Sequence, residues 1–281
     1  MKFVTASSGW RVLKLNAIQT YLGDGTQEDN VLDFCRNQGF NWLQYYGLYT
    51  VLGGGTNPNT GNLYTDDLAA FITKTRTVFG INRIGAIMGA GTAGFSLALA
   101  YSAAYPNAAF NDYNKENEFW NYPAPGTEKF ADWIASMNWL RAQVSAPDFI
   151  SAYIANPGGA IWGVSEAEDM VNAGIDYFET TNYTTYTGPP SNPAKAQDVI
   201  DDSLNFLAGA CINIGASQKF KFNDLMSVEP GFQGPYFTDH GVTGTFTEWK
   251  TQYAAINYTG KGRAINTGFN VFSYDDLRAA I

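Results

Sequence analysis

The sequence predicts a closed (β/α)8 barrel, and three observations lead to this prediction. Short apolar segments typical of strands recur eight times, a helical segment lies in each of the seven gaps between them, and no linker separates two halves. Strands that alternate with helices form parallel sheets through βαβ units. Eight such repeats in about 250 residues fit one closed barrel better than an open sheet. We therefore predict a single domain over residues 1–281, with a last helix that is truncated or absent.

In the first half of the chain, each strand segment is followed by a polar or glycine-rich loop and then by a helical pattern. Thr26 and Thr65 are N-cap candidates, and Gly39 and Gly80 follow the helices as terminators. Pro106 ends the third helix. We expect strands over 11–19, 41–46, 83–88 and the stretch that begins at 110, and helices over 27–37, 65–79 and 95–104.

The second half repeats the same alternation. Thr127 and Ser165 are N-cap candidates. The helix after Thr127 has a stripe of apolar residues at helical spacing, which we assign to the core: Phe130, Trp133, Ile134, Met137 and Leu140. We expect strands over 149–154, 175–181, 219–228 and 264–274, and helices over 127–144, 166–172, 196–212 and 247–256.

Charge and hydropathy exclude several classes of partner. The net charge is −9 and no cluster of lysine and arginine occurs, which argues against nucleic-acid binding. Neutral ligands, sugars especially, suit a chain with 15% aromatic residues. No apolar run approaches the ~20 residues of a membrane span, and the N-terminus lacks the apolar core of a signal peptide. We nevertheless expect an extracellular or surface-displayed protein, with membership of a larger protein assembly as a further possibility.

Cysteine and histidine are too scarce for several kinds of site. Cys35 and Cys211 are too few for a disulfide scaffold or a zinc site, and we interpret both as buried thiols. His240 is the one histidine, and no G-x-S-x-G nucleophile motif occurs. We expect neither a metal nor a cofactor.

A row of polar side chains on the fourth strand is the first candidate site. If the strand continues, Asp112, Asn114, Glu116 and Glu118 share one face, with Cα atoms roughly 6.5–7 Å apart. Burying such a row is costly, so it lines either a polar cleft or water. Crowding of carboxylates raises at least one pKa, which suits a general acid. An acidic surface loop is the alternative.

A glycine-rich loop follows the third strand. Gly89, Gly91 and Gly94 form a G-x-G-x-x-G pattern between a strand and a helix, the setting of a dinucleotide fingerprint. Such fingerprints normally belong to the first βαβ unit, and this chain has 29 glycines. We interpret the loop as a tight turn that lets the backbone approach a ligand or a neighbouring helix.

Four strand segments resemble motifs of the chitinase-type (family 18) glycoside hydrolases. The fourth strand is similar to F-D-G-x-D-x-D-x-E-Y, and three others are similar to S-x-G-G, M-x-Y-[DN] and V-W-S-Y-D-D. The segments are, in that order, Phe110–Phe119, Ile84–Gly91 with Phe95, Thr181–Thr184 and Val271–Asp276. The resemblance implies a barrel that acts on N-acetylglucosamine-containing glycan.

The same resemblance implies roles for individual residues. Glu118 would be the general acid, and Glu116 would orient the acetamido group that acts as internal nucleophile. Tyr183 would steady that group, Asn114 would be the inner partner of Glu116, and Phe272 would lie under the sugar. Further substrate contacts are expected at Asp112, Asn182, Tyr274 and Trp120. The chain departs from the pattern at Asn111, Asn114, Glu116 and Phe272.

A second glycosidase template uses two glutamates. It places an Asn-Glu pair after strand four, here Asn117 and Glu118, and a nucleophile after strand seven, here Glu229. Glu229 is otherwise a turn residue before Pro230. Three functions follow as hypotheses: a glycoside hydrolase with Glu118 as acid, a barrel without catalysis that binds glycan or serves as a structural module of a larger assembly, and a dinucleotide-dependent enzyme.

Overall fold

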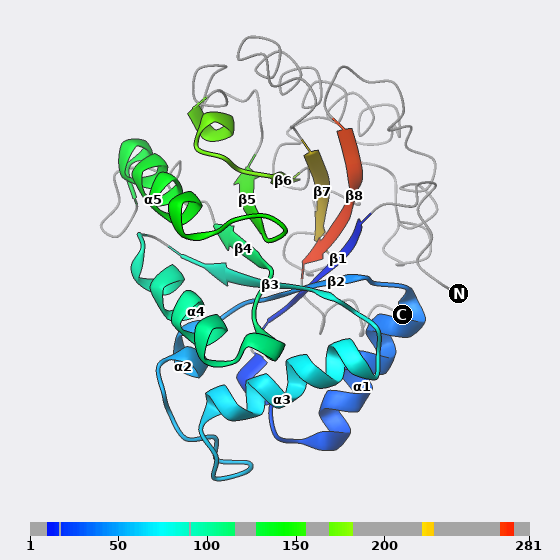
Figure 1. Ribbon diagram of the computed structural model, residues 1–281. Helices are drawn as coiled ribbons and strands as arrows, with labels where there is room; N and C mark the ends of the chain where they lie inside the picture. The colour runs from blue at the N-terminus through cyan, green and yellow to red at the C-terminus, as the bar shows by residue number, and fades with distance from the viewer. Residues whose placement is uncertain are drawn as a thin grey trace.

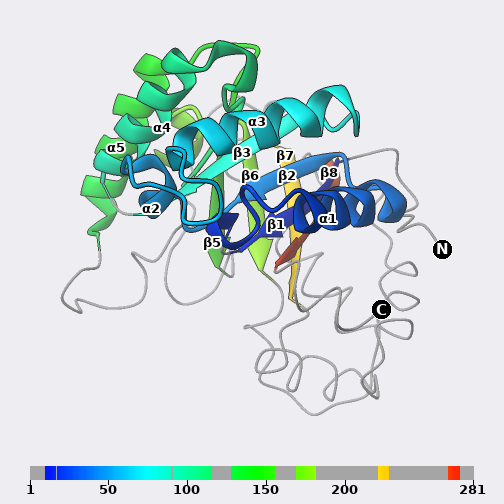
Figure 2. The ribbon, with the colours of Figure 1, turned by 90° about the horizontal axis from the view of Figure 1, so that it is seen from below.

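The computed structural model describes residues 10–16, 18–89, 91–115, 128–155, 169–181, 221–227 and 265–272. Within them, eight parallel strands close into a barrel in sequence order, with β8 hydrogen-bonded to β1. Helices α1, α3, α4 and α5 lie outside the strands (Figures 1 and 2). The strands are β1 (Trp10–Leu15), β2 (Trp42–Tyr45), β3 (Arg83–Met88), β4 (Asp112–Lys115), β5 (Phe149–Ala155), β6 (Tyr177–Thr181), β7 (Lys221–Ser227) and β8 (Ile265–Phe272). The predicted (β/α)8 class is confirmed. The single domain over 1–281 and the truncated last helix stay predictions.

The strand register decides which residues share the inner face of the barrel. Gln44 is the Cα partner of Gly85, and Gly85 is the partner of Asp112. Two residues along β4, Asn114 is the partner of Ser151 on β5. Because side chains alternate along a strand, these positions project to the same side of the sheet.

The first βα unit differs from the sequence prediction at two points. Strand β1 ends at Leu15, and a 3-10 turn, η1 (Ile18–Thr20), replaces the predicted end of the strand. Helix α1 (Gly25–Gln38) is capped by Asp24 and not by Thr26, because the Asp24 carboxylate accepts from the backbone N–H groups of Thr26 and Gln27. The helix ends at Gly39 as predicted, in a left-handed conformation with φ 82°.

The remaining described helices lie near the predicted positions, with one addition. The addition is α2 (Leu48–Leu52), a five-residue helix that is too short to show apolar periodicity. The others are α3 (Tyr64–Thr77), α4 (Ala93–Ala104), the 3-10 turn η2 (Pro106–Ala108) and α5 (Phe130–Gln143). Thr65 is not the cap that was predicted, because it lies inside α3, whose N-cap is Leu63. Residues 169–172 are helical within the predicted 166–172, and the predicted helices 196–212 and 247–256 lie outside the described residues. None of the helices described is apolar over enough length to cross a membrane.

The main core lies between the barrel and its helices. Trp133, Met137 and Leu140 of α5 are buried, and Phe130 and Ile134 pack against them, which confirms the predicted stripe. Burying a large apolar side chain contributes about 1.5–3 kcal/mol. Cys35 is a buried free thiol, as expected, and burial raises its pKa.

Two polar residues extend strand pairing at the amino ends of β4 and β6. Asn111 Oδ1 accepts from the Ile84 N–H at 2.8 Å, and the Asn111 N–H donates to the Ile84 carbonyl at 3.0 Å. Asp176 repeats the arrangement with Ile150, at 2.9 Å to Oδ2 and 2.8 Å from its own N–H. Each side chain thus serves as an additional backbone-like acceptor beside the neighbouring strand.

The Asp67 carboxylate at the start of α3 organises the loop before it. It accepts from Asn57 at 2.7 Å, Thr60 at 2.6 Å and Asn62 at 3.0 Å. Burial opposes ionisation of Asp67, but these three hydrogen bonds outweigh it and lower the pKa of the carboxyl group. Asn57 also donates to the Leu22 carbonyl at 2.8 Å, so this loop is tied to the segment after η1.

Candidate ligand site at the carboxyl end of the barrel

An aromatic floor, formed by Trp42, Phe149 and Tyr177, closes the amino end of the barrel interior. Each is the first residue of its strand. The Trp42 and Tyr177 rings meet edge to face with centroids 5.4 Å apart, and the Phe149 and Tyr177 centroids are 4.8 Å apart. Arg83 lies over the Phe149 ring, 3.6 Å from its centroid. Burial lowers the pKa of this guanidinium, partly offset by Asp112.

Asp112 lies at the level above the floor and is fully buried. Its Oδ2 accepts from the indole N–H of Trp42 and the amide of Gln44, both at 3.1 Å. Its Oδ1 accepts from the Ser151 hydroxyl at 2.7 Å. Three donors from two strands of the barrel, β2 and β5, therefore converge on one carboxylate that acts only as an acceptor.

Gly85 provides the space for this carboxylate. A Cβ at Gly85 would lie 2.3 Å from Asp112 Oδ2 and 2.9 Å from Gln44 Cγ. Any larger residue would displace the group that orders the network. The requirement for glycine here is steric and does not depend on the backbone conformation.

Asn114 completes the polar layer, which we define as Gln44, Asp112, Asn114 and Ser151. The Asn114 amide donates to Ser151 Oγ at 2.8 Å, while the Ser151 hydroxyl donates to Asp112. This direction fixes the amide, because Ser151 has one proton and has already given it to the carboxylate. Asn114 Oδ1 is buried, and no donor in the described part of the chain reaches it.

Two further amide oxygens have the same property after β1. Among the described residues, no donor reaches Asn16 Oδ1 or Gln19 Oε1, and both atoms are buried. Buried polar atoms are nearly always hydrogen-bonded, so each exception needs an explanation. Asn16 and Gln19 lie in the segment that follows β1, and Asn114 lies near the carboxyl end of β4.

An ion pair borders the carboxyl end of β4. Lys115 Nζ lies 2.7 Å from Glu128 Oε2, and both side chains are largely buried. Glu128 Oε1 accepts from the Gly91 N–H at 3.0 Å, and Lys115 Nζ donates to the Gly91 carbonyl at 3.5 Å. Burial lowers the pKa of Lys115, and Glu128 opposes this shift. Within the described ranges, no group of three metal-binding side chains occurs.

In the glycine-rich loop after β3, Gly91 is hydrogen-bonded to Glu128, and Gly94 allows close packing against Tyr49 of α2. Glu128 takes the Gly91 N–H, a donor that a nucleotide phosphate would use. A Cβ at Gly94 would lie 2.6 Å from the Tyr49 hydroxyl and 2.8 Å from Met88 Cε. The tight approach to a neighbouring helix, here α2, agrees with our interpretation of the loop.

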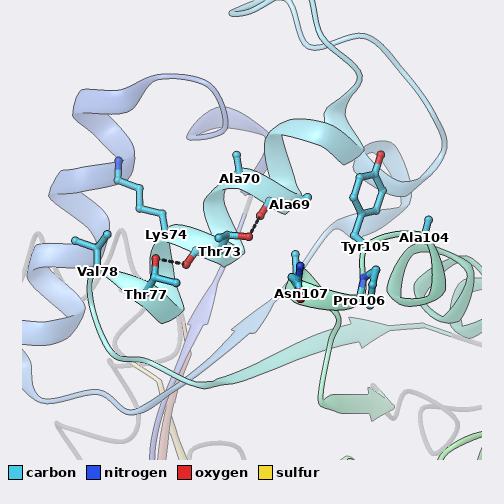
Figure 3. Close-up of a pocket in the computed structure, with 11 residues that line it drawn as sticks. Ala69, Ala70, Thr73, Lys74, Thr77, Val78, Ala104, Tyr105, Pro106 and Asn107 are labelled. Atoms are coloured by element: carbon cyan, nitrogen blue, oxygen red, sulfur yellow. Dashed lines mark hydrogen bonds between the residues drawn. The ribbon is translucent and has the colours of Figure 1, made fainter.

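A hollow lies elsewhere, on the outside of the barrel between α3 and η2 (Figure 3). Its volume is about 660 Å³, and four alanines are among the eleven residues that line it. The hydroxyls of Thr73 and Thr77 donate to helix carbonyls at 2.7 and 2.8 Å. Tyr105 donates to Asp66 at 2.6 Å. Because these three hydroxyl groups already donate to protein acceptors, we assign the candidate site to the barrel interior and not to this hollow.

The structure brings together two of the residues predicted for the site. Asp112 and Asn114 share the inner face of β4 and both contact Ser151. Phe272 is the last residue of β8, with Ser227 as its Cα partner. Seven predicted site residues lie outside the described residues and stay predictions: Glu116, Glu118, Trp120, Asn182, Tyr183, Glu229 and Tyr274.

Three members of the site were missed by the sequence analysis. Gln44 and Ser151 are polar residues at inward positions of apolar strands, and Gly85 is a glycine inside a strand. Each was a signal, because polar residues and glycines inside buried strands need a partner or a close neighbour. Gln44 and Asp112 are 68 positions apart, however, so their contact follows only from the closed barrel.

No protein-family model and no curated protein matches the chain. Among solved structures, it resembles 2,3-dimethylmalate lyase, a member of the PEP mutase/isocitrate lyase superfamily, with TM-score 0.48 and 13% identity over 97% of this chain and 78% of that one. It also resembles oxaloacetate acetylhydrolase, with TM-score 0.48 and 10% identity over 99% and 80% of the two chains. A third is a putative deoxyribose-phosphate aldolase from Coccidioides immitis, with TM-score 0.47 and 9% identity over 96% and 83%. At such identities, the activities of these proteins are not carried to this chain.

The predicted relation to family 18 chitinases is wrong, and the glycoside hydrolase and glycan-binding functions inferred from it are wrong with it. The solved structures that the chain resembles include 2,3-dimethylmalate lyase, a putative phosphonomutase and a putative deoxyribose-phosphate aldolase. The fourth strand gives a physical reason. Asn111 pairs with the β3 backbone, and both oxygens of Asp112, an expected substrate contact, accept hydrogen bonds from side chains of the barrel, so both residues hold strands together. A carbohydrate ligand and a larger assembly find no support.

Proposed function

We propose that this barrel binds a small polar molecule at the carboxyl end of its strands, and that the ligand donates a hydrogen bond to Asn114 Oδ1. The observation that carries the proposal is this oxygen, buried and without a described donor in a layer that is otherwise hydrogen-bonded. Ligands of (β/α)8 enzymes sit at this end of the barrel.

The polar layer is built in advance of binding. Asp112 orients Ser151, and Ser151 orients the Asn114 amide. The acceptor is therefore fixed before a ligand arrives, which reduces the entropic cost of association. The aromatic floor supports this layer from below.

The chemistry of the acceptors defines the class of ligand. The oxygens without described donors at Asn16, Gln19 and Asn114 are all amide oxygens, which accept hydrogen bonds and cannot donate them. Such a surface suits N–H or O–H donors. We therefore propose amides, alcohols or amines as ligands, and not molecules that offer acceptors alone.

A matched pair of probes tests the proposal. Acetamide has N–H donors, and N,N-dimethylacetamide has none. We expect acetamide to shift the side-chain amide NMR signal of Asn114 in a saturable way, and the dimethyl compound to leave it in place. Asn114→Leu should weaken acetamide binding about tenfold, the value of one hydrogen bond at its upper range.

The controls separate binding from stability. Asn114→Leu removes an oxygen without a donor and also the hydrogen bond to Ser151 Oγ, so its free energy of unfolding should fall by about 1 kcal/mol, the usual net value of one hydrogen bond. Thr75→Val, which removes the buried hydroxyl bonded to the Phe71 carbonyl, should leave acetamide binding unchanged. Equal shifts with both probes, or none with acetamide, would refute the proposal and favour a buried water at Asn114.

A further inference from the structure

Glu128 and Lys115 hold one residue, Gly91, from both sides. The Gly91 N–H donates to Glu128 Oε1, the second Glu128 oxygen pairs with Lys115, and Lys115 donates to the Gly91 carbonyl. The three contacts form a closed ring, which we call the Gly91 clamp. It joins the β3–α4 loop to the end of β4 and to the residue two before α5.

The clamp lies at the same end of the barrel as the proposed ligand site, on the helix-facing side of β4, because the side chains of Asn114 and Lys115 leave opposite faces of the strand. Lys115 follows Asn114 in β4, and its Cα partner on β3 is Met88. The β3–α4 loop begins directly after Met88. A shift of this loop would therefore change the shape of the barrel mouth next to Asn114.

Stability alone does not account for a buried ion pair at this position. The side chain of Lys115 has no exposed surface and that of Glu128 is 9% exposed. Desolvation of two charges often exceeds their attraction, so apolar residues of similar size frequently give equal or greater stability. What the apolar pair cannot do is accept from the Gly91 N–H.

We propose that Glu128, held by Lys115, is a positioning residue that fixes Gly91 and thereby the β3–α4 side of the mouth. Gly91 has a φ of +70°, a left-handed conformation, and no atom lies within 4 Å of the point that a Cβ would occupy there. The loop is thus held by hydrogen bonds to Glu128 and Lys115 and not by packing at Gly91. The effect on ligand affinity rests on the proposed function, whereas the fixation of Gly91 does not.

The test compares local with global opening. Lys115→Met combined with Glu128→Met removes both charges and the acceptor while keeping the bulk. We expect unfolding stability near that of the wild type, with hydrogen exchange at the Gly91 amide about ten- to a hundredfold faster, the range of a hydrogen bond to a charged group. Glu128→Gln keeps an oxygen at this position and should retain most of the Gly91 protection.

The outcomes separate the two proposals. Unchanged exchange at Gly91 in the double variant, with exchange at Leu32 in α1 as the reference, overturns the clamp whatever the ligand does. Faster exchange with unchanged acetamide affinity overturns the positioning role. If the wild type does not bind acetamide, the proposed function fails, and the exchange data still decide whether the clamp fixes Gly91.

Discussion

The aromatic floor and the polar layer lie one above the other in the same barrel and are built by different means. In the floor, rings from β2, β5 and β6 contact one another, and Arg83 stacks on one of them. In the polar layer, side chains from β2 and β5 converge on the Asp112 carboxylate of β4. Trp42 connects the two: its ring is part of the floor, and its indole N–H donates to Asp112 in the polar layer.

The difference shows where the barrel interior contains buried polar groups in place of apolar packing. Apolar side chains that fill the interior would give a stable barrel without any buried charge. The floor follows that rule. The polar layer departs from apolar filling. Within the described residues, its oxygen without a donor is Asn114 Oδ1, and Asn114 lies on the carboxyl side of Asp112 in β4.

The largest effect should come from removing the centre of the polar layer. Asp112→Ala leaves the donors of Trp42, Gln44 and Ser151 without their acceptor, and each such loss costs about 1–3 kcal/mol. We expect the free energy of unfolding to fall by about 3–5 kcal/mol, measured by urea denaturation. Asp112→Asn, which keeps one acceptor oxygen, should lose less. Equal free energies of unfolding for Asp112→Ala and the wild type would show that hydrogen bonds to Asp112 do not stabilise the polar layer.

A smaller effect is expected where space and not chemistry is changed. Gly85→Ala places a methyl group 2.3 Å from Asp112 Oδ2, so the carboxylate must move. Overpacking of this kind costs about 1–3 kcal/mol in unfolding experiments. The matched control is Gly25→Ala at the start of α1, where no atom lies within 4 Å and a gain of about 0.4–1 kcal/mol is expected. Equal changes in the free energy of unfolding for Gly85→Ala and Gly25→Ala would contradict the conclusion that Asp112 needs the space beside Gly85.

The smallest effect concerns pH and a carboxylate outside the barrel interior, Asp67. Its pKa is lowered in the folded protein by hydrogen bonds that outweigh burial. The resulting stabilisation is present above the unfolded value of about 3.9 and is lost as pH falls through the lower folded pKa. Between pH 5 and pH 3, stability should therefore fall more steeply in the wild type than in Asp67→Asn. Asp169→Asn, at an exposed position, serves as the control, and identical slopes for wild type and Asp67→Asn would disprove the assignment.

Much of the fold could be predicted from the sequence, because alternating apolar strands and helices report local structure directly. The order of the strands, the positions of α3 and α4 and the core stripe of α5 are confirmed. The end of β1 was missed because Tyr21 and Leu22 turn back to bond the Ile18 carbonyl, which no periodicity reveals. The cap of α1 was misplaced by two residues because Asp24 and Thr26 are both good caps.

The site was predicted only in part, for a physical reason. Asp112 and Asn114 were found because alternating polar residues in a strand are conspicuous. Their partners Gln44 and Ser151 come from other strands, and closure of the barrel decides that they meet. The same alternation misled the interpretation of function, since a polar network inside a barrel and a sugar-binding motif produce similar short patterns.

Asn111 and Asp176 have a consequence for the whole interior. Each clasps the neighbouring strand from its own side chain and backbone together, at the β3–β4 and β5–β6 seams. A register shift of one residue in either strand pair would turn the inward side chains of the shifted strand outward. It would also break both hydrogen bonds of that pair. These two residues therefore fix the register of their strand pairs. Asn111 sets the height at which Asp112 meets Gly85, and it does so at the opposite end of the barrel from the proposed ligand site.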